Sequence, residues 1–178
     1  MDKNTRLQDQ VMTTSSPTVN FKELLKRPAC FLGLGFGSGL APKAPGTFGT
    51  LAAVPIYWLM QDLSLAIYLA LTIFGFIVGI WICQQSANWL GKEDPSAVVW
   101  DEIVGYLVTM AAAPSGWQWM VIGFVLFRFF DILKPWPISY ADKNLHGGFG
   151  IMLDDVIAGI FAWFVIYLVA SSEIINIY

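Results

Sequence analysis

The chain has 178 residues, of which 56% are hydrophobic and only 13% charged, and its formal net charge at pH 7 is −3. Soluble domains carry about 25% charged residues. This composition therefore excludes an ordinary soluble domain and favours a single domain whose solvent is mostly lipid.

The first 28 residues are polar and show no hydrophobic pattern. We predict a disordered tail over residues 1–28, without a cleavable signal peptide, and one membrane-embedded domain over residues 29–178. Cys30 and Cys83 stand in apolar stretches and lack the spacing of a metal site or a redox motif. Both are expected to be inert packing residues.

A loop rich in glycine and proline, GFGSGLAPKAPGTFGT, follows at residues 35–50 and carries one cation, Lys43. Glycines let backbone N–H groups approach an anion, and a helix that starts after the loop adds partial positive charge. The loop lacks the GK[ST] unit of a Walker motif. We predict a re-entrant or interfacial loop, and on this stretch alone a ligand is neither required nor excluded.

Five apolar segments follow the tail. A spanning helix needs about 20 residues, which only the second and fifth segments reach comfortably, while Pro55 is expected to bend the first. The predicted fold is all-α, a polytopic transmembrane helical bundle of four to five spans. The segments cover residues 48–60, 63–90, 98–113, 117–130 and 151–171.

Positive charge is distributed unevenly among the connections. If five spans alternate across a membrane, all ten Lys and Arg residues lie on one side. The opposite connections, around residues 61–63, 114–116 and 172–178, contain no Lys or Arg. The positive-inside rule places the basic side in the cytoplasm.

Two acidic pairs enter apolar segments from that same side, in WDEIVG and MLDDVIAG. A single pair is explained by the helix dipole, which favours carboxylates in a first turn. Here each pair is followed by two β-branched residues and then by small ones, Gly105 or Ala158–Gly159, which permit close helix packing in a membrane. Up to four carboxylates then meet and require cations, and an oxygen-only ligand set suits Mg²⁺. The four are Asp101, Glu102, Asp154 and Asp155.

The segment FRFFDILKPWPIS supplies cations. Arg128, Asp131 and Lys134 are spaced i, i+3, i+6 and share one helical face, and Pro135 and Pro137 end that helix. The alternative is that the cations extend to the lipid headgroups, which suits Lys134 better than the deeper Arg128.

Carboxylates, a metal and cations together indicate phosphate-ester chemistry. A mechanism with two catalytic histidines is excluded because His146 is the only histidine, and we expect it at the surface. A cysteine phosphatase needs a thiolate near an arginine, and neither cysteine is so placed. Metal-assisted attack by water or by an aspartate remains, and the sequence does not choose between them.

Four motifs, KAPGTFGT, WDEIVG, FRFFDILKPWPI and GGFGIMLDDVIAG, resemble in order and spacing the phosphatidylglycerophosphatase A family of bacterial lipid phosphatases, over about residues 33–165. The resemblance implies Mg²⁺-dependent hydrolysis of the phosphate monoester of phosphatidylglycerophosphate to phosphatidylglycerol and phosphate. It also implies a multi-pass protein of the bacterial inner membrane with its site on the cytoplasmic face. The expected partners are the substrate and membrane lipid, and no nucleic acid.

The resemblance implies which acidic and basic residues are the site candidates, and we divide the roles among them by charge and position. Asp131 is assigned either to orient Arg128 or to activate water, and Asp101, Arg128 and Asp131 are the catalytic candidates. The metal ligands are expected to be Asp101, Glu102, Asp154 and Asp155, and the phosphate-binding residues Lys43, Thr47, Arg128 and Lys134.

Two other functions compete with a lipid phosphatase. A transferase that moves a phospho-alcohol between lipids also uses intramembrane aspartates, but its D-G-x-x-A-R signature is absent. A small transporter would use carboxylates to carry protons or cations. Against it, the charges cluster at one face and no carboxylate lies in the middle of a predicted span.

Overall fold

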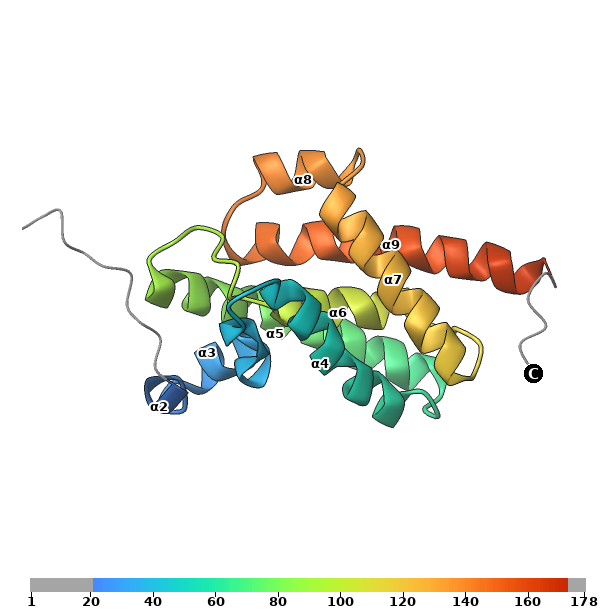
Figure 1. Cartoon of the computed structure of the whole chain (residues 1–178), viewed down its shortest axis with the longest axis horizontal. Coiled ribbons are helices and arrows are strands. Elements are labelled where there is room, and N and C mark those ends of the chain that lie inside the picture. Colours follow the sequence, from blue (N-terminus) through green and yellow to red (C-terminus); the bar gives the residue numbers. More distant parts are fainter. Residues whose placement is uncertain (1–20, 173–178) are drawn as a thin grey trace, which may run out of the picture.

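The computed structural model describes residues 21–172, and every regular element within that range is a helix. The predicted all-α class is therefore confirmed for this part of the chain (Figure 1). The elements are α2 (Phe21–Leu24), α3 (Pro28–Gly33), the 3₁₀ helix η1 (Gly35–Leu40), α4 (Pro45–Met60), α5 (Leu65–Leu90), α6 (Trp100–Thr109), α7 (Trp117–Leu133), α8 (Ile138–Asn144) and α9 (Gly147–Ser171).

The prediction of a disordered tail up to residue 28 is wrong for residues 21–28. Residues 21–28 include α2 and the first residue of α3, and Leu24 is fully buried against Cys30, Leu34 and Cys83. One buried leucine in a four-residue helix leaves no periodic pattern, so the sequence did not reveal it. Residues 1–20 lie outside the described part of the chain. Both cysteines are free and buried, as expected of packing residues.

Helix length distinguishes two of the predicted spans from the others. Among residues 21–172, α5 and α9, with 26 and 25 residues, are long and apolar enough to cross a membrane. The prediction of four to five spans is not confirmed, because α4 and α7 have 16 and 17 residues and α6 has only 10. At 1.5 Å per residue, α6 rises about 15 Å, half of a bilayer core of about 30 Å.

Helix α9 starts four residues before the predicted segment, at Gly147. The acidic pair therefore lies in the third turn of α9, not at its head. The glycines of GGFG have low helix propensity, so the sequence pattern did not predict that this first turn is helical. Helix α4 also starts earlier than predicted, at Pro45, and continues through Pro55.

Helices α6 and α9 cross closely where small residues were predicted to allow it. A Cβ on Gly159 would meet the Gly105 carbonyl oxygen at 2.5 Å, and a Cβ on Gly105 would meet the Asp155 carbonyl oxygen at 2.9 Å. A larger residue at either position would push the helices apart. The approach brings the acidic pair of α6 next to that of α9.

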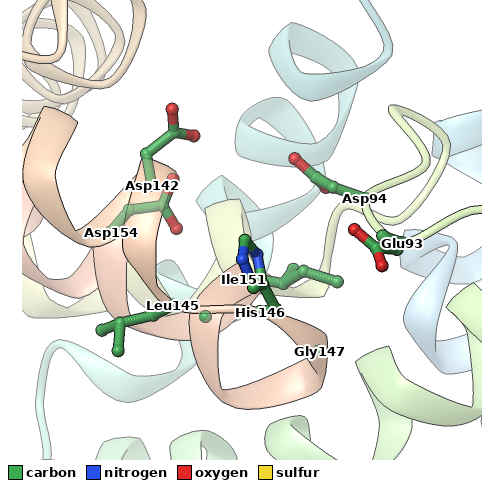
Figure 2. A pocket seen from close by; sticks show the side chains of 9 residues that line it. Glu93, Asp94, Asp142, Leu145, His146, Gly147, Ile151 and Asp154 are labelled. Atoms are coloured by element: carbon green, nitrogen blue, oxygen red, sulfur yellow. The ribbon is translucent and has the colours of Figure 1, made fainter.

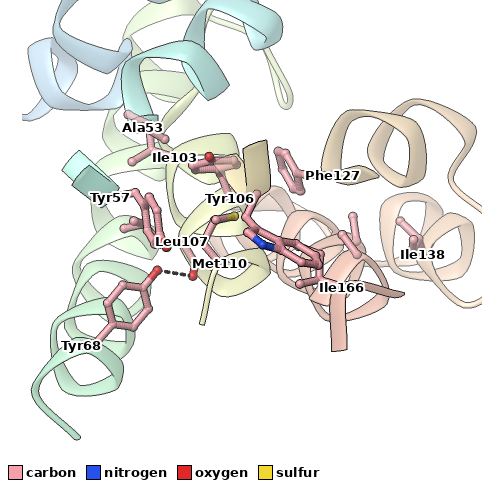
Figure 3. Close-up of a cluster of buried hydrophobic side chains, with 13 residues drawn as sticks. Ala53, Tyr57, Tyr68, Ile103, Tyr106, Leu107, Met110, Phe127, Ile138 and Ile166 are labelled. Atoms are coloured by element: carbon pink, nitrogen blue, oxygen red, sulfur yellow. Dashed lines mark hydrogen bonds between the residues drawn. The ribbon is translucent and has the colours of Figure 1, made fainter. Parts of the chain in front are cut away.

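The core around α6 fixes this helix in depth and rotation (Figure 3). The Tyr68 hydroxyl of α5 donates to the Leu107 carbonyl at 2.6 Å, and the Tyr106 hydroxyl donates to the Met120 carbonyl of α7 at 3.0 Å. Buried hydroxyls need such partners. These bonds tie α6 to α5 and α7 and thus hold the start of α6 in place.

The helix ends separate into two groups (Figure 1). The N-termini of α4, α6 and α9 and the C-termini of α5 and α7 share one end of the bundle, which we call the basic end. Every described Lys and Arg lies in α2, in the loops at this end, in α8, or in the second-last turn and at the C-cap of α7. The connections over residues 61–64 and 110–116 lie at the other end and contain no Lys or Arg.

Candidate active site

A cavity of about 330 Å³ opens at the basic end between α4, α6, α7 and α9. Its walls bring together seven of the nine residues proposed from the sequence, and carboxylates outnumber cations six to two. The seven are Asp101, Glu102, Arg128, Asp131, Lys134, Asp154 and Asp155.

Three carboxylates in this cavity form a compact group, which we call the triad. Asp101 and Glu102 in the first turn of α6 and Asp155 of α9 each place an oxygen within 4.8 Å of the others. Asp101 and Asp155 are 9% and 3% exposed. One oxygen of each of the three is buried without a hydrogen-bond partner: Asp101 Oδ1, Glu102 Oε2 and Asp155 Oδ2.

Buried like charges at this spacing require a cation or protons between them. The donor set consists only of carboxylate oxygens, which suits a hard divalent cation. The unpartnered oxygens offer the free lone pairs that such an ion needs. The residues present therefore fit a metal ion.

Asp154 does not join the triad. Its Oδ2 accepts from the Lys134 ammonium at 2.7 Å, whereas its Oδ1 is buried without a partner. Neighbouring residues on a helix project about 100° apart, so Asp154 and Asp155 face different groups. The structure thus brings together three of the four predicted metal ligands and separates the fourth.

Arg128 lies in the second-last turn of α7 and points into the cavity. It pairs with Asp131 at i+3, and its Nη1 lies 3.8 Å from Glu102 Oε1. Its side chain is 15% exposed and its Nε is buried without a hydrogen-bond partner. Arg128 therefore does not extend to the lipid headgroups, and it keeps a donor for an anion.

Gly46 brings the start of α4 against this arginine. A Cβ on Gly46 would collide with Glu102 Oε1 and lie 2.9 Å from Arg128 Nη1. Its neighbours Lys43 and Thr47 do not line the cavity, because Lys43 is exposed and Thr47 is half-buried one residue beyond the wall. Their role in phosphate binding stays a prediction.

Sequence reasoning missed two acidic residues near the site. Asp142 of α8 pairs with Lys134, and Asp94, in the loop before α6, lines the cavity. Each is a single charge in a polar stretch, so only the tertiary fold identifies it. Burial raises the pKa of Asp94 above its ordinary value.

A second cavity of about 280 Å³ lies beside the first and shares Asp154 and Asp94 with it (Figure 2). Asp142 and Asp154 stand on one wall, and Glu93 and Asp94 on the other. His146 lines this cavity and is exposed, as expected for a surface residue. Burial alone would lower the pKa of Lys134, but its hydrogen bonds to Asp142 and Asp154 raise it, so the ammonium stays charged.

Comparison with known proteins identifies the family of this chain. The profile of phosphatidylglycerophosphatase A matches residues 31–170. Proteins of that name from Escherichia coli (strain K12) and Haemophilus influenzae (strain Rd) are 43% and 44% identical to this chain, over 146 and 160 residues. These matches cover 82% and 89% of this chain and 85% and 97% of the relatives.

A third relative, from Bacteroides thetaiotaomicron, carries the provisional name phosphatidylinositol-3-phosphatase. It is 40% identical over 153 residues, which cover 80% of this chain and 95% of the relative. No solved structure gives a significant match. The family profile and the first two relatives agree over most of the chain, which therefore belongs to the phosphatidylglycerophosphatase A family.

Proposed function

We propose that this protein hydrolyses the phosphate monoester of phosphatidylglycerophosphate, releasing phosphatidylglycerol and inorganic phosphate, with Mg²⁺ as cofactor. Membership of the family and the names of the first two relatives support the reaction. The observation that carries the proposal is the triad beside Arg128 in one cavity at the basic end.

The triad of Asp101, Glu102 and Asp155 would hold the metal. Mg²⁺ prefers carboxylate oxygens and commonly keeps waters and binds substrate phosphate besides one or two protein ligands. When bound, the ion supplies positive charge to the phosphoryl oxygens. Asp154, one residue away, lies outside the triad and acts through Lys134.

Arg128 binds the phosphoryl group through its planar fork, which matches two phosphate oxygens at once. The ion pair of Asp131 with Arg128 supports an orienting role for Asp131 over activation of water. Gly46 leaves the space in front of the guanidinium open. Lys134 adds a second cation to the same wall.

We propose that the protein is a single membrane-embedded domain of the bacterial inner membrane, with the cavity at the cytoplasmic leaflet. The length and apolar composition of helices α5 and α9 support a crossing of the bilayer by both. Helices α4 and α7 would rise about 24–26 Å, enough to cross where flanking residues or a thinned bilayer make up the difference. Helix α6 enters only halfway. The positive-inside rule then puts the basic end in the cytoplasm.

The test is phosphate release from phosphatidylglycerophosphate by the purified protein in detergent, with Mg²⁺ and then with a chelator. Asp101→Asn should abolish release, whereas Asp62→Asn, an exposed acidic residue at the opposite end, should not. Because one relative carries a different name, phosphatidylinositol 3-phosphate is assayed in parallel. Faster release from that lipid would overturn the proposed substrate, and release that survives the chelator would overturn the metal.

A further inference from the structure

Lys134 occupies a backbone conformation that is unusual for its type. It caps the C-terminus of α7 with φ 44° and ψ 55°, in the left-handed region. Glycine adopts this conformation without strain and is the usual residue at such a cap. A lysine in this position indicates that the side chain itself is required there.

The side chain of Lys134 joins two helices that are distant from it in sequence. Its ammonium donates to Asp142 of α8 and to Asp154 Oδ2 of α9. Asp142 and Asp154 stand together on one wall of the smaller cavity (Figure 2). Asp154 also lines the larger cavity, and so does Lys134. The ammonium is thus held from behind by two acceptors while it lines the cavity that also contains Arg128.

An ammonium group has three N–H donors. Within residues 21–172, Asp142 and Asp154 accept two of them, and the structure gives the third no partner. With the first two directions fixed, the third is fixed as well. The open donor is the part of Lys134 left for the cavity.

We propose that Asp142 is a positioning residue for the phosphatase reaction: together with Asp154 it fixes the Lys134 ammonium so that one N–H remains for an anionic phosphoryl oxygen. The inference rests on the proposed function, since it assigns the cavity to a phosphate monoester. Asp142 itself does not line this cavity and acts through Lys134.

Attachment of α8 does not explain the Asp142 contact. Helix α8 already packs through Ile138, which is fully buried, and Ala141, which is 4% exposed. The Asp142 side chain is 31% exposed, and partly exposed ion pairs contribute little to folding stability. A role in orienting Lys134 is the better account.

The experiment measures Asp142→Asn in the full-length protein in detergent with Mg²⁺. Two readouts are taken: the KM for phosphatidylglycerophosphate, and the affinity for inorganic phosphate followed by phosphorus NMR titration. Loss of one charge-assisted hydrogen bond in the network predicts about a tenfold weakening of both, with kcat changed by about twofold or less. Lys143→Gln, which removes an exposed charge from the next position of α8, is the matched control and should change neither.

A double-mutant cycle separates positioning from a structural effect. In a Lys134→Met background, Asp142→Asn should weaken phosphate binding no further. Equal effects in both backgrounds would overturn the proposal, as would unchanged affinity in Asp142→Asn. Asp142→Glu keeps the charge and serves as a second variant if Asp142→Asn folds poorly. It should bind phosphate within about threefold of wild type, and a loss as large as that of Lys134→Met would count against the proposal.

These outcomes are distinct from failure of the proposed function. If wild-type protein binds inorganic phosphate but does not release it from phosphatidylglycerophosphate, the substrate is wrong and the cycle on phosphate affinity still tests Asp142. If wild-type protein binds no phosphate at all, both proposals fail.

Discussion

The two groups of carboxylates at the basic end balance their charge in different ways. The triad of Asp101, Glu102 and Asp155 brings three acids together, and its nearest cation is Arg128, 3.8 Å from Glu102. The pair Asp142 and Asp154 instead shares the Lys134 ammonium. The first group needs a cation from outside the chain, and the second is neutralised in part from within. This contrast teaches that adjacent aspartates of one motif can have different charge partners.

The largest effect is expected at the triad. Asp155→Asn should lower kcat by about 10³-fold or more, because a metal ligand supplies several kcal/mol of transition-state stabilisation. Asp154→Asn should instead lower kcat/KM by about 10–100-fold, mainly through a higher KM, because it weakens only the hold on Lys134. Phosphate release at saturating Mg²⁺ measures both. If Asp154→Asn proves as severe as Asp155→Asn, the division between the groups is wrong.

In the absence of metal, Asp155→Asn and Asp154→Asn should shift Tm in opposite directions. Asp155→Asn removes one of three crowded like charges and should raise Tm in the presence of a chelator. Asp154→Asn replaces a charged acceptor of the partly buried Lys134 ammonium by a neutral one and should lower Tm. Melting of the two variants and wild type in detergent, with Asp62→Asn as control, checks the sign. Shifts of the same sign would show that the groups do not differ in charge balance.

Added Mg²⁺ should then stabilise wild type and Asp154→Asn but not Asp155→Asn. At a concentration about 100 times its Kd, a ligand adds about 2.7 kcal/mol, which corresponds to about 5–10 °C in Tm for a chain of this size. Stabilisation of Asp155→Asn by the same amount as wild type would place the ion elsewhere. This measurement needs no substrate and is independent of the reaction.

The sequence could predict the residues of the triad, but it could not predict that Asp154 lies outside it. Two acidic pairs, each followed by small residues, predict that α6 and α9 meet at their acidic ends, and Gly105 and Gly159 make that contact. The sequence could not place Asp154 apart from Asp155, because the register of α9 depended on a first turn hidden in GGFG. Helix α6 was expected to span, yet it ends before Pro114 after 10 residues.

A role for Asp142 could not be predicted from the sequence, for a different reason. It stands in a seven-residue helix with a mixed composition and no motif, and only tertiary contact with Lys134 gives it a role. Conversely, Arg128, Asp131 and Lys134 were predicted on one face by helical spacing. The structure pairs Arg128 with Asp131, whereas Lys134 ends the helix and turns toward α8 and α9.

On the triad side, Arg128→Lys should have an intermediate effect. A lysine keeps the charge but loses the fork that binds two phosphate oxygens and the contact with Asp131. We expect kcat/KM to fall about 10–100-fold, with Mg²⁺ stabilisation unchanged. The combination of steady-state kinetics and melting checks this. If Mg²⁺ stabilisation falls as well, Arg128 supports the metal ligands and not only the phosphate.

The smallest effect is expected at Gly46, where the backbone of α4 meets the Glu102 and Arg128 side chains. Gly46→Ala adds a Cβ that collides with Glu102 Oε1 and lies 2.9 Å from Arg128 Nη1, and both are ends of flexible side chains that can shift. The protein should therefore fold, with KM for the lipid raised about tenfold, since one strong hydrogen bond is misaligned. Because Glu102 also belongs to the triad, the half-saturating Mg²⁺ concentration should rise in the same variant. A change in KM alone would mean that Arg128 moves and Glu102 does not, so that the phosphate and metal halves of the cavity respond separately.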